Sequence, residues 1–182
     1  GFNDKGVFVT LSNLPVRRDD ARSRGALVDD LLRAGSVADA RSLLCETYDE
    51  HVYEGFNVVV GSSESCFVGI NDGGLRVTEP GFGTHVVTNS PFDEPDDKAR
   101  RVEDAVPDAT GHPNPHDWLD AVRPVLADHD IGVCVHDDGR GTTSSNLVHV
   151  APEPSESNWL FADGPPCKNS YGPVFPSPRG KE

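Results

Sequence analysis

Residues 56–78 read FNVVVGSSESCFVGINDGGLRVT and indicate the fold more clearly than any other part of the chain. Three runs typical of strands occur there, at 56–60, 65–70 and 75–78. Between the last two runs, Asn71-Asp72-Gly73-Gly74 supplies residues that adopt a positive φ at little cost, as a tight hairpin requires. With Thr84–Thr88 as a further strand, the sequence predicts a four-stranded antiparallel meander.

Helices are predicted on both sides of this meander. Leu27, Leu31 and Leu32 share one helical face, and Ser36 is placed to cap a second helix. Further helices are expected over 98–106 and from Pro115, where proline suits the first turn. Later strands are expected at 131–136, 146–150 and 158–163. This order predicts a layered α+β sandwich, as a single domain over residues 1–182 with an irregular tail over 164–182.

The charge of the chain is strongly negative. Sixteen basic residues stand against thirty acidic ones, a net charge of −14, which disfavours a nucleic-acid partner. The acidic residues are dispersed and only four of the basic ones are lysine, a composition that indicates a halophilic protein. Apolar runs are too short for a membrane span, and the prediction is a cytoplasmic location.

Composition and motifs predict no cofactor and no metal. Cys45, Cys66, Cys134 and Cys167 form no CxxC pair, so free thiols are favoured over disulfides or a metal site. Prolines at 113 and 115 break the helix that would pair His112 with His116 as ligands, and a solvated loop is expected there.

Two strand ends carry an asparagine followed within two residues by proline, in Asn13-Leu14-Pro15 and in Asn89-Ser90-Pro91. A carboxamide NH₂ held at a strand end is a neutral, orientable donor for a developing oxyanion. Asparagine at such a place also serves turns, and for either residue alone the turn is the favoured interpretation.

These motifs carry a family resemblance. GFNDKG at 1–6, NLP at 13–15 and TNSPFD at 88–93 resemble the N-terminal-nucleophile hydrolases of the choloylglycine hydrolase and penicillin V acylase group. The NRDE family, also called the Transport and Golgi organisation protein 2 family, is a closer relative that the chain resembles over roughly residues 1–150. The segments that carry this closer likeness are Ser23-Arg24-Gly25, Tyr53–Asn57, Gly83-x-His85 and Lys98.

The resemblance implies an αββα four-layer sandwich and a catalytic plan. In the acylase relatives an N-terminal Cys attacks an amide, its α-amine is the base, and two asparagines hold the oxyanion. Asn13 and Asn89 match those asparagines. The chain starts on Gly1 and contains no Met, so it is expected to be an inactive fragment of a C–N hydrolase, incomplete at the N-terminus. Arg140 is a possible substitute for the family arginine expected near Thr143.

A second function class stays open on the same fold. The resemblance also implies a non-catalytic ligand-binding or trafficking protein that handles lipid or haem. His85 or His136 could serve a haem, although a lone histidine on a strand is more often a packed or surface residue. The expected partner is accordingly a small-molecule amide or a lipid-like ligand.

Overall fold

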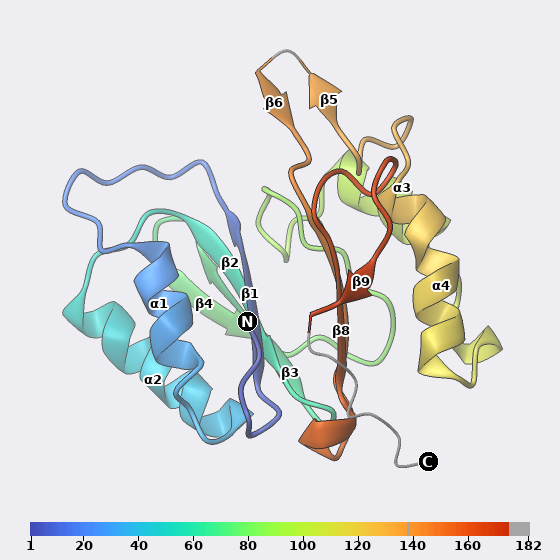
Figure 1. Ribbon diagram of the computed structural model, residues 1–182. Coiled ribbons are helices and arrows are strands. Elements are labelled where there is room, and N and C mark those ends of the chain that lie inside the picture. The colour runs from blue at the N-terminus through green and yellow to red at the C-terminus, as the bar shows by residue number, and fades with distance from the viewer. Residues whose placement is uncertain (138, 175–182) are drawn as a thin grey trace. The chain divides into compact units, whose positions relative to one another are not determined.

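A computed structural model describes residues 1–137 and 139–174, which divide into two compact units. The first contains Gly1–Ala99 and Val150–Glu156, and the second contains Arg100–His149 and the described residues from Ser157 onward. Figure 1 shows their helices and strands. The single domain expected from the sequence stays a prediction.

The first unit contains an antiparallel sheet in the order β1-β2-β3-β4. Its strands are β1 (Phe8–Asn13), β2 (Phe56–Gly61), β3 (Cys66–Asn71) and β4 (Leu75–Thr78). The expected meander is confirmed for β2, β3 and β4, with Gly73 at φ 129° in the last hairpin. The fourth strand is β1, which pairs with β2 from Phe8 opposite Gly61 to Asn13 opposite Phe56.

Two helices cover one face of this sheet, as Figure 1 shows. They are α1 (Arg24–Leu31) and α2 (Val37–Glu50). Ser36 caps α2 as expected, because its Oγ accepts from the amide of Asp39 at 3.1 Å. At Gly69 the helix comes so close that an added Cβ would lie 2.6 Å from Leu44 Cδ2. The sheet and helices therefore pack without room for a side chain at that position.

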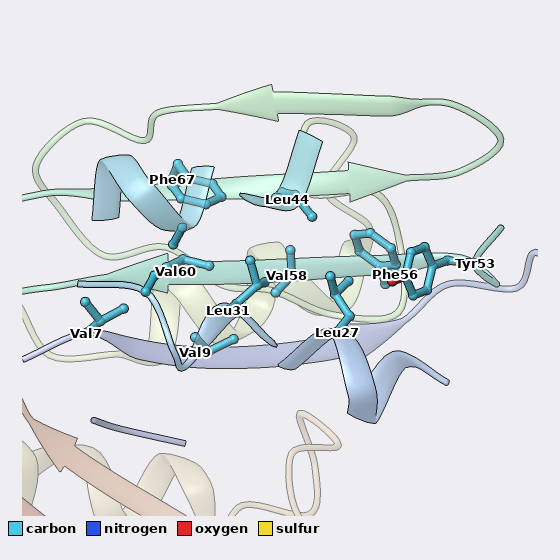
Figure 2. Packing of buried hydrophobic residues seen from close by; sticks show 12 residues of the cluster. Val7, Val9, Leu27, Leu31, Leu44, Tyr53, Phe56, Val58, Val60 and Phe67 are labelled. Atoms are coloured by element: carbon cyan, nitrogen blue, oxygen red, sulfur yellow. The ribbon is translucent and has the colours of Figure 1, made fainter. Parts of the chain in front are cut away.

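The main core lies between these helices and the sheet. Phe56, Val58 and Val60 alternate along β2 toward the helices, where Leu27 and Leu44 are also fully buried (Figure 2). Residues between them in β2 point to the opposite face, where Leu14, Val68 and Ile70 form a smaller cluster. The alternation gives the sheet one face for the helices and another that is available to the candidate site.

The second unit combines helices with a three-stranded antiparallel sheet, β7-β8-β9. Its sheet strands are β7 (Ser145–His149), β8 (Asn158–Ala162) and β9 (Gly172–Pro173). The unit also contains a short hairpin of β5 (His136–Asp137) and β6 (Arg140–Gly141), and most of α3 (Asp97–Ala105). Helix α4 (Pro115–Leu126) begins at Pro115 as expected and packs on β7. Short 3₁₀ turns lie at Ala109–Gly111 in this unit and at Pro154–Glu156 in the first.

Several expected elements differ from the structure. Residues 84–88 form no strand, and Thr88 is instead held by side-chain hydrogen bonds. Only His136 of the expected strand 131–136 is in a strand, because the preceding residues turn around Asp128. The tail expected to be irregular contributes β9, while its last part, 175–182, lies outside the described residues. The α+β class is confirmed, and the four-layer sandwich stays a proposal.

Candidate functional site

The structure brings the two asparagines singled out in the sequence together in the first unit. Asn13 is the last residue of β1, and Asn89 lies in the loop beyond 84–88. Although 76 residues separate them, Nδ2 of Asn89 donates to the main-chain carbonyl of Asn13 at 2.8 Å. Both residues are exposed. The bond occupies one of the two N–H groups of Asn89, so the pair forms an amide-rich surface at the end of the strand.

Asn57 fixes the loop that carries Asn89. It is fully buried in β2, and its Nδ2 donates to the carbonyl of Ser90 at 2.8 Å and to that of Thr88 at 3.3 Å. Its Oδ1 accepts from the amide of Phe92 at 3.1 Å. The carbonyl of Thr88 also accepts from Ser12 Oγ at 2.5 Å. The buried carboxamide of Asn57 thus satisfies main-chain groups of this loop, which a neighbouring strand would satisfy if the loop were part of the sheet.

Asp96 attaches the same loop to the start of α3. Its Oδ1 accepts from the amide of Ala99 at 2.7 Å, and its Oδ2 accepts from the hydroxyls of Ser90 at 2.7 Å and Thr88 at 3.1 Å. These bonds, chiefly that from Ala99, stabilise the carboxylate and hold the pKa of Asp96 below its usual range. The charged form of Asp96 therefore stabilises both the helix start and the loop.

A polar pocket of about 530 Å³ opens beside Asn13. Arginines 18, 22 and 24 line it together with Glu54. Arg24 pairs with Glu54 at 3.0 Å and Arg22 pairs with Asp30 at 2.6 Å. The contact between Arg24 and Glu54 joins the segments 23–25 and 53–57 that were singled out in the sequence. The volume is in the range of small-molecule sites.

A second, more apolar pocket of about 460 Å³ lies on the sheet face that the helices leave open. Val59 and Val68 from the sheet and Val87 and Phe92 from the loop line it. His85 also lines this pocket, with its ring centroid 5.9 Å from that of Phe92 and its Nε2 2.7 Å from the carbonyl of Gly81. The loop that carries Asn89 thus also forms one wall of a cavity.

The other residues weighed from the sequence lie in the second unit. Arg140 is in β6, Thr143 follows that strand, and the role of Arg140 as a substitute stays a prediction. The loop expected over 112–116 ends at Asn114, because α4 begins at Pro115 and contains His116. The ring of His116 lies 5.6 Å from that of His149. Within residues 1–137 and 139–174, the residues that could jointly hold a metal lie elsewhere, at His129, Cys134, His136 and Cys167.

Sequence reasoning missed this group of histidines and cysteines. Cys134 and His136 are two residues apart, a spacing that could have drawn attention to them. Cys167 is 31 residues from His136, and only the folded chain shows that the two are in contact. A search of the sequence for CxxC pairs cannot find a contact between residues so far apart.

The first unit is an antiparallel sheet covered by a helical hairpin, with a polar site where β1 ends. The chain matches the family model described as Transport and Golgi organisation 2 over residues 1–138, and it belongs to that family. A search of curated proteins gave no significant match. Over the described residues, no helix has both the length and the apolar character needed to cross a bilayer.

Proposed function

We propose that this protein is an amide (C–N) hydrolase on an αββα N-terminal-nucleophile fold, with activity that depends on an N-terminal Cys. The observation that carries the proposal is the bond from Asn89 to Asn13, which joins two distant family motifs at one strand end. Carboxamide N–H groups gathered at such a point suit an oxyanion. The polar pocket beside Asn13 would receive the substrate.

The chemistry follows that of an activated N-terminal thiol. The thiol of an N-terminal Cys adds to the amide carbon, and its proton passes through the α-amine to the leaving amine. Water then cleaves the resulting thioester and releases the acid. In both steps negative charge develops on the carbonyl oxygen, where Asn13 and Asn89 would donate. Asn57 acts through the loop as a positioning residue.

The pairing at the start of the chain is compatible with this plan. Phe2 pairs antiparallel with Phe8, and the amide of Val9 donates to the carbonyl of Gly1 at 2.9 Å. A segment that preceded Gly1 and kept this register would run along β1 toward Asn13. Such a segment would therefore approach the candidate site.

The test begins with the N-terminal sequence of the native protein. A mature chain that starts with Cys supports the mechanism, whereas one without Cys, Ser or Thr at its start excludes it. In a Cys-initiated protein, Asn89→Ala should lower the hydrolysis of a fluorogenic N-acyl amide by about 10²–10³-fold. Asn114→Ala is the matched control, because Asn114 caps α4 in the second unit through the amide of His116. Equal rates for the two variants would remove Asn89 from the mechanism.

A non-catalytic binding function is the second candidate, and the apolar pocket favours it. We propose a lipid-like ligand or haem there, since valines and Phe92 line the cavity with His85 at its side. Val87→Trp should fill the pocket and weaken binding of a fluorescent fatty acid at least ten-fold. Val86→Trp is the control, because Val86 is not among the lining residues.

Hemin is the second probe of this pocket. Its Soret band should shift on binding to the unaltered chain, and this shift should be lost in His85→Ala. Unchanged binding of both probes in the Val87 and His85 variants would reject this function.

A halophilic, cytoplasmic origin is proposed from composition. The dispersed acidic residues and the scarcity of lysine suit a surface that is stable when its repulsion is screened.

A further inference from the structure

Four side chains in the second unit converge on one point. They are those of His129, Cys134, His136 and Cys167, and one ligand atom from each lies within 4.8 Å of all the others. Nε2 of His136 lies 3.1 Å from Sγ of Cys167 and 3.6 Å from Sγ of Cys134. The rings of His129 and His136 have centroids 5.0 Å apart. The group is thus compact and contains two sulfur and two imidazole donors.

Ordered turns hold these residues in place. Asp128 accepts from the amide of Ile131 through its Oδ1 and from that of Cys134 through its carbonyl, both at 2.9 Å. Gly132 permits this turn with φ 75°. On the other side, the amides of Lys168 and Asn169 both donate to the carbonyl of Pro165, which folds the chain around Cys167. Backbone hydrogen bonds therefore aim ligands from two distant segments at one point.

We propose that His129, Cys134, His136 and Cys167 bind one zinc ion in a tetrahedral Cys₂His₂ site. Thiolate and imidazole together are the donors that select zinc. Zinc–sulfur bonds of about 2.3 Å and zinc–nitrogen bonds of about 2.0 Å place tetrahedral ligands roughly 3.3–3.8 Å apart. The contacts of 3.1 and 3.6 Å are close to this spacing. All four ligand atoms lie within 4.8 Å of one another, so side-chain adjustments of up to about 1 Å would complete the geometry.

The site is structural rather than catalytic. Four protein ligands fill a tetrahedral zinc and leave no position for water or substrate. Binding would deprotonate both thiols and release their protons to solvent. The metal would tie the turn at 128–136 to the segment around Cys167, in a unit whose sheet includes a strand of only two residues. This role is independent of the proposed hydrolase or binding function, because none of the four residues belongs to the first unit.

The test uses the purified chain, reduced and stripped of metal with a chelator, and titrated with Co²⁺ and then Zn²⁺. We expect one Co²⁺ per chain with the visible absorption of a tetrahedral site and a thiolate charge-transfer band, both abolished when Zn²⁺ displaces it. Cys134→Ser and Cys167→Ser should each weaken binding by more than the ~100-fold that loss of an outer-shell partner costs. His129→Asn and His136→Asn should also weaken it.

The controls are Cys45→Ser, Cys66→Ser and His112→Asn, which lie outside the group and should bind as the unaltered chain does. Circular dichroism of each apo variant, together with the zinc content of the unaltered chain, separates loss of a ligand from loss of the fold. A chain that binds no Co²⁺ or Zn²⁺ under reducing conditions would overturn the proposal. So would zinc binding that survives the double substitution of Cys134 and Cys167. Isolation of the native protein with these two cysteines joined in a disulfide would also overturn it.

Discussion

Replacing Asn57 with alanine should release the loop that carries Asn89. Asn57 is fully buried, and it is the partner of the carbonyl of Ser90 and of the amide of Phe92. The carbonyl of Thr88 would keep its bond from Ser12 Oγ, so two main-chain groups lose a partner. Asn57 also donates to Ser12 Oγ in β1 at 3.2 Å, so the perturbation acts mainly, but not solely, on the attachment of this loop.

The expected cost follows from those two groups. A buried polar group left without a partner costs about 1–3 kcal/mol, and the lower half of that range applies because a loosened loop admits water. We expect Asn57→Ala to lower the free energy of unfolding by about 2–4 kcal/mol. The amide of Phe92 should exchange with solvent at least about ten-fold faster, since a factor of ten corresponds to ~1.4 kcal/mol.

Asn71→Ala provides a matched control in the same sheet. Asn71 is also buried, and it donates to the carbonyls of Tyr53 and Glu54 and accepts from the amide of Gly73 and the hydroxyl of Tyr48. By the same reasoning Asn71→Ala should cost at least as much free energy of unfolding as Asn57→Ala, measured in urea. Hydrogen exchange read residue by residue should then separate the two variants, because Asn71 has no bond to the loop. If Phe92 exchanged equally fast in both variants, or if Asn57→Ala unfolded like the unaltered chain, the anchoring role would be refuted.

Two further predictions concern charge. The pKa of Asp96 is lowered in the folded chain, so its contribution is fully present above its unfolded value of about 3.9 and is lost as the pH falls through the folded value. Because Asn caps a helix about as well as Asp, Asp96→Asn removes mainly the charge, and it should cost about 0.3–1 kcal/mol at neutral pH and progressively less below about pH 3.9. Urea unfolding at several pH values measures this cost, and a cost independent of pH would argue against the charged cap. For the whole chain, transfer from molar KCl to dilute buffer should lower the melting temperature, because a net charge of −14 is then less screened. Equal melting temperatures in the two buffers would contradict the halophilic interpretation.

The sequence predicted those parts of the fold that depend on local pattern. Apolar alternation and the glycine pair at 73–74 located β2, β3 and β4, and Ser36 marked the start of α2. The pairing of β1 with β2 was not predictable in this way. Two helices separate these strands in the sequence, and periodicity carries no information on which strands pair. Residues 84–88 have strand composition but are held by Ser12 and Asn57 instead of a neighbouring strand.

The candidate site shows the same division between local and distant information. Matching contexts and family resemblance singled out Asn13 and Asn89, and the contact between them agrees with that choice while leaving their role a proposal. Asn57 drew attention only as part of a family segment, because nothing in a sequence distinguishes a buried carboxamide inside a strand. The group of histidines and cysteines around Cys167 was not predicted, because it is formed by a contact between residues 31 positions apart. Composition and spacing do not reveal such a contact.

The anchoring of the loop by Asn57 has a consequence for how this family can diversify. Asn57 recognises only main-chain groups of the loop, the carbonyls of Thr88 and Ser90 and the amide of Phe92. The attachment by Asn57 therefore does not depend on the side chains of Val87 and Phe92 in the wall of the apolar pocket. Substitutions at those positions can reshape the cavity for a new ligand while the loop keeps its place, so specificity and architecture are under separate control.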